Sequence, residues 1–218
     1  MRPETLILAF DTSAAHCAAA LLRGPRVLAL RHEEMGRGQA ERLFPLLEEM
    51  LAGAGCGWTA LDAVAVGTGP GNFTGTRIAV AAARGLALSL GVPAIGVTGF
   101  EALAEGAPGP VLATLAAPRG QVYLQRLDGG RAGPAEIADP DTWTPPPGAP
   151  AALCLGAEAG RLAARLGWQA GTPRHAPAEA IARAALGRVG HKAPRPAPVY
   201  LRPADAAPPA DAPPTILP

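Results

Sequence analysis

The sequence predicts an α/β fold in two parts, a compact N-terminal half and a smaller, loop-rich C-terminal half. Apolar runs of strand length alternate with helical stretches, which is typical of parallel strands in a mixed sheet. Hydrophobic residues make up 49% of the 218 residues, enough to build a sizeable core. Of the 25 prolines, five lie in residues 1–105 and twenty in residues 106–218, so the two halves differ in character.

In the first half, the apolar runs 5–11, 16–23 and 26–34 are expected to form three consecutive strands. A tight turn at Gly24-Pro25 favours an antiparallel meander for them. A helix is then predicted over 39–54, with an apolar arc of about 160° and with Pro45 expected to kink it or mark a restart.

The rest of the first half should hold a buried strand over 61–67, a helix over 75–90 and a strand over 92–97. A short helix over 98–105 should follow, with Thr98 as its N-cap. We therefore assign residues 1–105 to an N-terminal lobe.

The sequence signals for secondary structure are weaker after Gly106, and we assign residues 106–203 to a smaller C-terminal lobe. The elements expected there are a hairpin of 110–117 and 121–127 around Arg119-Gly120, a loop over 144–150, a strand over 151–155, and helices over 157–166 and 177–189. The remaining residues, 204–218, are of low complexity and rich in proline, and we expect a disordered tail.

The composition excludes several classes of protein. Charged residues are only 17% and the formal net charge is +1, which excludes a strongly basic nucleic-acid coat protein and an acidic tail protein.

Cys17, Cys56 and Cys154 are widely spaced in apolar settings, which favours buried free thiols in a reducing cytosol. Because we find neither a membrane-length apolar run nor a signal peptide, we expect an unexported, cytoplasmic protein.

The strongest local motif is the loop Gly69-Pro70-Gly71-Asn72-Phe73-Thr74-Gly75 between a strand and a helix. Such a loop can present backbone N–H groups to an anion at a helix start, although no Gly-Lys-Ser/Thr makes it a Walker loop. The alternative is a tight turn whose threonine caps the helix. The tripeptide Asp11-Thr12-Ser13 also has two interpretations. It could hold a metal–phosphate group, or it could form an Asx turn that starts the hairpin. The candidate anion-loop residues are Asp11, Thr12, Ser13, Gly69, Gly71, Thr74 and Gly75.

The four histidines, at 16, 32, 175 and 191, lie in unrelated predicted elements. No two of them are spaced to share one helical face, so we predict no metal site. No Ser-His-Asp or Cys-His pairing is indicated either, and we predict no catalytic residue and no cofactor.

The predicted helix over 75–90 is apolar almost all round, so it must be buried all round. Either it is a central core helix, or another chain covers one side, with its alanines and Gly85 allowing close approach. We predict that the first two helices, over 39–54 and 75–90, carry a partner interface, and that the chain alone pairs as a homodimer. The candidate interface residues are Leu43, Leu47, Arg77, Ala81, Arg84 and Leu88.

Charge is uneven along the chain, because residues 158–202 hold eight Arg and Lys against two Glu. This segment could contact an RNA backbone. Solvated helix faces explain it equally well, since no aromatic platform accompanies the charges.

Together these motifs resemble the bacterial TsaB (YeaZ) family. The matching runs are Asp11-Thr12-Ser13, Glu-Arg-Leu-Phe-Pro-Leu-Leu at 41–47, Gly-Pro-Gly-Asn-Phe-Thr-Gly-Thr-Arg-Ile at 69–78, Arg-Gly-Leu-Ala at 84–87, Gly-Gln-Val-Tyr at 120–123 and Tyr-Leu-Arg-Pro at 200–203. The resemblance covers most of residues 5–203. The run at 69–78 is its most specific part.

The resemblance implies an actin-like (ASKHA, ribonuclease H-like) fold of two lobes with a reduced second lobe. It also implies a non-catalytic subunit for making threonylcarbamoyladenosine next to the tRNA anticodon, working with a catalytic TsaD-like subunit and a TsaE-like ATPase. Contact with tRNA would then be indirect, through the complex. The alternatives are a stand-alone actin-like ATPase or kinase, using Asp11, Thr12 and the 69–75 loop, and a tRNA-binding module using residues 158–202.

One motif departs from the family pattern, which usually has Asp-Ala-Arg-x-Gly-Glu-Val-Tyr at the second-lobe hairpin. This chain has Ala116-Ala117-Pro118-Arg119-Gly120-Gln121-Val122-Tyr123. Two carboxylates, at the positions of Ala116 and Gln121, and an arginine are therefore absent.

Overall fold

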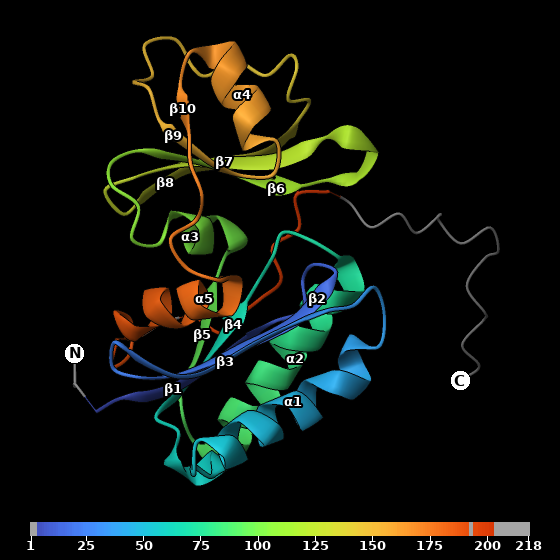
Figure 1. The fold of residues 1–218 in the computed structure, drawn as a ribbon, viewed down its shortest axis with the longest axis vertical. Helices are drawn as coiled ribbons and strands as arrows, with labels where there is room; N and C mark the ends of the chain where they lie inside the picture. Colours follow the sequence, from blue (N-terminus) through green and yellow to red (C-terminus); the bar gives the residue numbers. More distant parts are fainter. Residues whose placement is uncertain (1–3, 192–193, 203–218) are drawn as a thin grey trace, which may run out of the picture.

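The computed structural model describes residues 4–191 and 194–202 and consists of two lobes, each built on a five-stranded sheet (Figure 1). Strands and helices alternate in both lobes, so the predicted α/β class is confirmed. Within the described residues, no helix is both long and apolar enough to cross a membrane. The segment 204–218, which we predicted to be a disordered tail, lies outside the described residues.

The first sheet has the strand order β3-β2-β1-β4-β5. The strands β1 (Leu6–Asp11), β2 (His16–Arg23) and β3 (Arg26–Glu34) form the predicted antiparallel meander. The strands β4 (Ala63–Gly67) and β5 (Ala94–Val97) continue the sheet in parallel with β1. The carboxyl ends of β1 and β4 therefore lie at one edge, facing the second lobe.

Helices cover both faces of the first sheet because its central strands are buried on both sides. Leu8 and Phe10 of β1 pack towards α1 (Gln39–Gly53) and α2 (Phe73–Leu90). The alternate residues Ile7 and Ala9 pack against α5 (Pro177–Leu186) on the opposite face. Figure 1 shows α5 between this sheet and the second lobe, with α1 and α2 on the far side.

The position of α5 corrects the predicted lobe boundary. We expected all of 106–203 to lie in the second lobe, but α5 packs on the sheet of the first. Its small buried residues, such as Ala178, Ala182 and Ala185, let the helix axis approach the sheet closely. Val199, beyond α5, also contacts the first lobe, where its N donates to Thr68 O at 2.8 Å.

The second sheet has the strand order β10-β9-β6-β7-β8. Its bounds are β6 (Val111–Ala116), β7 (Val122–Asp128), β8 (Arg131–Ala138), β9 (Leu153–Gly156) and β10 (Gln169–Ala170). The predicted hairpin is confirmed as β6 and β7. The edge strands β8 and β10 were not predicted, because β8 contains Gly133-Pro134 and β10 has only two residues.

Two helices flank the second sheet. The helix α4 (Ala159–Leu166) packs on one face, and α3 (Gly99–Ala104) packs on the other, where it also contacts α5. Thr98 caps α3 as predicted, in a capping box with Glu101. The helix α1 runs from Gln39 to Gly53 without ending at Pro45, so it does not restart there.

Candidate functional site

The two motifs singled out from the sequence meet at the carboxyl ends of β1 and β4. Thr12 Oγ1 donates to Gly75 O at 2.7 Å, and Asn72 N donates to Ser13 O at 2.6 Å. A Cβ atom at Gly71 or Gly75 would overlap the carbonyl oxygen of Ser13 or Thr12. These glycines are therefore required for direct contact between the two loops.

The start of α2 corrects one detail of the sequence analysis. Its N-cap is Asn72, whose side-chain oxygen accepts from Gly75 N at 2.9 Å. Thr74, which we considered as the cap, is exposed to solvent. Asn72 is an equally good N-cap residue, so the motif alone did not distinguish the two.

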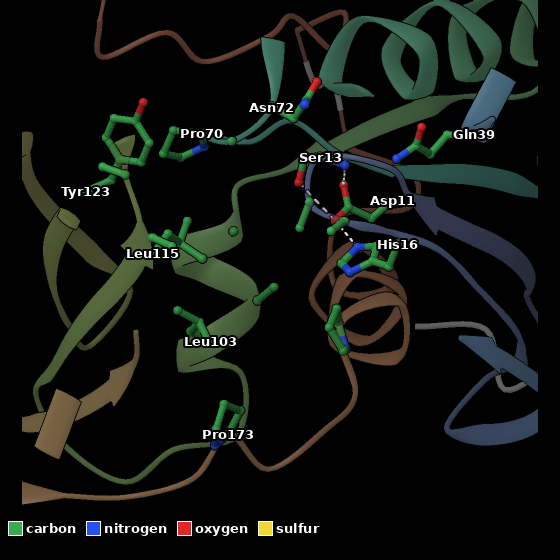
Figure 2. A pocket seen from close by; sticks show the side chains of 18 of the residues that line it. Asp11, Ser13, His16, Gln39, Pro70, Asn72, Leu103, Leu115, Tyr123 and Pro173 are labelled. Atoms are coloured by element: carbon green, nitrogen blue, oxygen red, sulfur yellow. Dashed lines mark hydrogen bonds and ion pairs between the residues drawn. The ribbon is translucent and has the colours of Figure 1, made fainter. Parts of the chain in front are cut away.

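The carboxylate of Asp11 is almost fully buried and is occupied by its own hairpin. One oxygen accepts from Ser13 N at 3.1 Å, and the other accepts from Ser13 Oγ at 3.0 Å and lies 2.9 Å from His16 Nε2 (Figure 2). A Cβ at Gly67 would overlap this carboxylate. Asp11 thus forms an Asx turn, as one of the two interpretations proposed.

A cleft of about 500 Å³ lies between the lobes and is bordered by these loops. Leu103 and Leu115 form part of its apolar wall, opposite Asp11 and His16 (Figure 2). The polar residues that line it are Asp11, Ser13, His16, Gln39, Asn72, Tyr123 and His175. Its lining, within the part of the chain that the structure describes, includes neither arginine nor lysine. A phosphate group in this cleft would therefore have no guanidinium or ammonium partner among these residues.

The hairpin that departs from the family pattern contributes to the same cleft. Ala116, Ala117 and Pro118 line it, and none of them carries a polar side chain. Gln121 follows the turn and is half-buried outside the lining set. The second-lobe wall is therefore apolar at the point where the family pattern has acidic and basic groups.

The histidines are less scattered than the sequence analysis assumed. The rings of His16 and His32 lie on adjacent strands with their centroids 4.9 Å apart, and His16 and His175 both line the cleft. Pairing of β2 with β3 brings the first two together, which linear spacing does not reveal. Among the described residues, no group of three or more His, Cys, Asp and Glu side chains is arranged to hold a metal ion.

The second site is the outer face of α2. Arg77, Ala81, Arg84 and Leu88 are all exposed, and Leu88 has 85% of its surface accessible. The residues buried on the opposite side include Ala79, Val80, Ala83 and Ala87. The expectation that the whole circumference is buried is therefore wrong for the single chain, and Leu88 is not a core residue.

The proposed contribution of α1 needs correction. Leu43 and Leu47 are both 0% exposed and belong to the core between α1, α2 and the first sheet. They cannot contact a partner without unfolding this lobe. Phe44, between them in the sequence, is 42% exposed and is a large apolar residue that α1 presents to solvent.

An aromatic cluster at the start of α2 was not predicted. The Arg77 guanidinium lies 3.7 Å from the centre of the Phe73 ring, and its Nε donates to the Tyr200 hydroxyl at 2.8 Å. The spacing of Phe73 and Arg77 by four residues could have indicated the first contact. No local signal could have indicated Tyr200, because it is 123 positions from Arg77.

Ionisable groups outside the cleft serve the fold. Arg42 of α1 donates to Glu33 of β3 at 2.6 and 2.7 Å and to Glu49 at 2.7 and 2.8 Å. These hydrogen bonds lower the pKa of both glutamates below the ordinary value of 4.5. Burial raises the pKa of the Cys17 thiol to about 11, with a smaller contribution from the charge of Glu33.

Comparison with known protein families gives consistent matches. The model of the family described as TsaD, tRNA N6-adenosine threonylcarbamoyltransferase, matches residues 32–137. The tRNA threonylcarbamoyladenosine biosynthesis protein TsaB of Escherichia coli is 38% identical over 122 residues, which are 54% of this chain and 52% of that protein. The Haemophilus influenzae TsaB is 35% identical over 127 residues, or 56% and 53% of the two chains. This chain thus spans about half the length of these curated relatives in the matched region.

Solved structures match over more of the chain. YeaZ from Pseudomonas aeruginosa superposes with a TM-score of 0.73 and 31% identity, covering 90% of this chain and all of that one. Component A of (R)-2-hydroxyglutaryl-CoA dehydratase from Acidaminococcus fermentans has a TM-score of 0.55 at 11% identity, covering 84% of this chain and 97% of that one. The latter likeness concerns the fold alone, and the expected actin-like fold of two lobes is confirmed.

Proposed function

The chain belongs to the TsaB (YeaZ) family, and from this membership we propose that it acts in tRNA threonylcarbamoyladenosine biosynthesis as a non-catalytic subunit. Its role would be to bind and support a TsaD-like catalytic subunit, with a TsaE-like ATPase joining the assembly. The proposed role implies a cytoplasmic location. The observation that carries the proposal is the exposed outer face of α2.

The chemistry of this face suits a helix of another chain. Leu88 exposes 85% of its surface, and with the exposed Ala81 and Gly85 it forms a contiguous apolar strip, a feature that favours an interaction site. Ala81 and Gly85 beside it are small, so a partner helix can pack closely. A Cβ at Gly85 would meet no atom within 4 Å, so the single chain leaves space there. In the absence of the partner, the same face would pair with its own copy through a two-fold axis.

The cleft gives less support to the alternative of a stand-alone ATPase or kinase. Such an enzyme needs charged groups that hold a metal–nucleotide complex between the lobes. Here the Asp11 carboxylate is taken up by Ser13 and His16, and the described lining residues include no arginine or lysine. The Ala116–Pro118 wall adds only apolar surface.

The alternative of a tRNA-binding module is also weakened, because described arginines of 158–202 are paired with acidic residues in different parts of the fold. Arg161 pairs with Asp141 in the second lobe, whereas Arg183 pairs with Glu179 and Arg188 with Glu101. Paired arginines on different lobes do not make a continuous track for an RNA backbone. We therefore propose that contact with tRNA is indirect.

Reconstitution tests the proposal. The chain is combined with TsaD-like and TsaE-like subunits from the same organism, tRNA and threonylcarbamoyl-AMP, and the modified nucleoside is measured by mass spectrometry. We expect formation to depend on the chain and to be lost in Leu88→Glu, because a carboxylate would be left unpaired against an apolar partner. Ala164→Glu, on the exposed side of α4, is the matched control and should behave as wild type.

The same preparations separate the proposal from its alternatives. The isolated chain should show no steady ATP hydrolysis and no salt-dependent retention of tRNA. ATP turnover by the chain alone that disappears in Asp11→Asn would establish an enzyme and overturn the proposal. Full formation of the modified nucleoside with Leu88→Glu, or without the chain, would overturn it as well.

A further inference from the structure

A second hollow lies at the C-terminal end of α2, away from the interlobe cleft. It has a volume of about 720 Å³ and is bordered by α2, β5 and the segment around Pro196. Leu88, which is exposed, and Val92, which is half-buried, give it an apolar side. We call this hollow the α2–β5 groove.

The polar side chains of the groove are all bases. They are Arg84, His191 and Arg195, and no acidic residue is among its described lining. Most other arginines in the last third of the described chain have a partner, as Arg183 and Arg188 do. Within residues 4–191 and 194–202, by contrast, neither Arg84 nor Arg195 makes an ion pair. The groove thus presents two uncompensated positive charges beside apolar surface.

The groove also contains a sheet edge. The strand β5 is the last in its sheet, so one of its sides has no neighbouring strand. At Gly96 this side is covered, because Pro196 packs there and Arg188 Nη1 donates to Gly96 O at 3.1 Å. Ala94, the first residue of β5, borders the groove instead, as does Pro93 before the strand. Proteins usually cover such edges, so an uncovered one next to apolar surface favours a docking position.

We propose that the α2–β5 groove receives an acidic segment of the TsaD-like partner. Carboxylates of that segment would meet Arg84 and Arg195, and an apolar side chain between them would contact Leu88 and Val92. The inference rests on the proposed function, because the groove shares Arg84 and Leu88 with the outer face of α2. It extends that interface beyond the helix to β5 and to the segment after α5.

Charge and surface chemistry together favour a protein segment over RNA. An RNA strand would satisfy the arginines but would leave the apolar surface of Leu88 and Val92 uncovered, and no Phe, Tyr or Trp lines the described part of the groove for base stacking. An acidic segment with an apolar residue satisfies both. Rim charges of this kind raise the association rate and make binding salt-dependent.

The test measures the dissociation constant of the full chain with the TsaD-like subunit at 50 and 300 mM NaCl. Arg195→Glu is the decisive variant, because Arg195 lies outside α2 and is exposed. We expect it to weaken binding about 5-fold at low salt, and the double variant Arg84→Glu with Arg195→Glu about 20-fold, with smaller effects at high salt. Arg131→Glu, an exposed position on β8 with the same change of charge, should have no effect.

Each outcome decides the proposal. If Arg195→Glu and the double variant bind as wild type at both salt concentrations while Leu88→Glu does not bind, the groove proposal is wrong and the proposed function stands. If the wild-type chain does not bind the TsaD-like subunit, both fail. If the arginine variants change only the homodimer or only retention of tRNA, the groove has another occupant and the proposal is overturned.

Discussion

Truncation of Leu88 separates a docking residue from a core residue. Leu88 is 85% exposed on the outer face of α2, whereas Leu47 on α1 is 0% exposed. Leu88→Ala should therefore leave the free energy of unfolding within about 0.5 kcal/mol of wild type. Leu47→Ala should lower it by about 2–5 kcal/mol, because the change leaves a cavity in the core.

The expected loss of binding follows from the same exposure. Full burial of a leucine side chain is worth about 1.5–3 kcal/mol, and nearly all of that surface is still accessible at Leu88. Because alanine keeps the Cβ, the loss on association should be about 1–2 kcal/mol. That corresponds to a dissociation constant about 5- to 30-fold weaker for the TsaD-like subunit.

The assay combines isothermal titration calorimetry for binding with thermal unfolding for stability, on both variants and wild type. Sedimentation of the chain alone reports the homodimer. The reasoning would be refuted if Leu88→Ala bound the partner and paired with itself as tightly as wild type. A large drop in its melting temperature would instead show that Leu88 is packed within the chain.

Three further predictions concern the fold and the loops. At pH 8 the half-buried Cys56 should be alkylated in the native chain. Cys17, whose buried thiol has a pKa of about 11, should be alkylated only after unfolding. The intact mass of the chain before and after unfolding counts the alkylated cysteines. Arg42 lowers the pKa of its two glutamate partners below 4.5, so its stabilising effect is present above that pH and is lost as the pH falls through the lowered values. Arg42→Met should therefore flatten the acid side of the melting-temperature profile between pH 2.5 and 6. An unchanged profile would show that the pairing of Arg42 with the two glutamates does not stabilise the fold. Gly75→Ala should destabilise the chain by about 1–3 kcal/mol, because its Cβ would overlap the Thr12 carbonyl oxygen. Gly85→Ala, in open space in the middle of α2, should stabilise the chain by about 0.5–1 kcal/mol. Denaturant titration measures both, and equal stabilities of the two variants would count against the contact between the Gly75 loop and Thr12.

Local patterns predicted much of the secondary structure. The strands at 16–23 and 26–34 match β2 and β3, because apolar composition and the Gly24-Pro25 turn act over neighbouring residues. Thr98 with Glu101 three residues later is likewise a complete local signal for a helix start. The strand β8 was not predicted, because a strand that contains Gly133 and Pro134 is tolerated only at the edge of a sheet. The position of β8 in the sheet is not visible in the local sequence.

The candidate sites depended on contacts between distant residues. The sequence by itself determined the motifs, the apolar character of α1 and α2, and the resemblance to a known family. Only the tertiary structure decided that Leu47 is core while Leu88 is exposed, since an apolar arc does not say which part of it faces the sheet. It also decided that Thr12 bonds to Gly75, 63 positions away, and that Tyr200 covers Arg77. The sequence gives the type of each side chain directly, but its burial and its contacts depend on which surfaces the folded chain brings together.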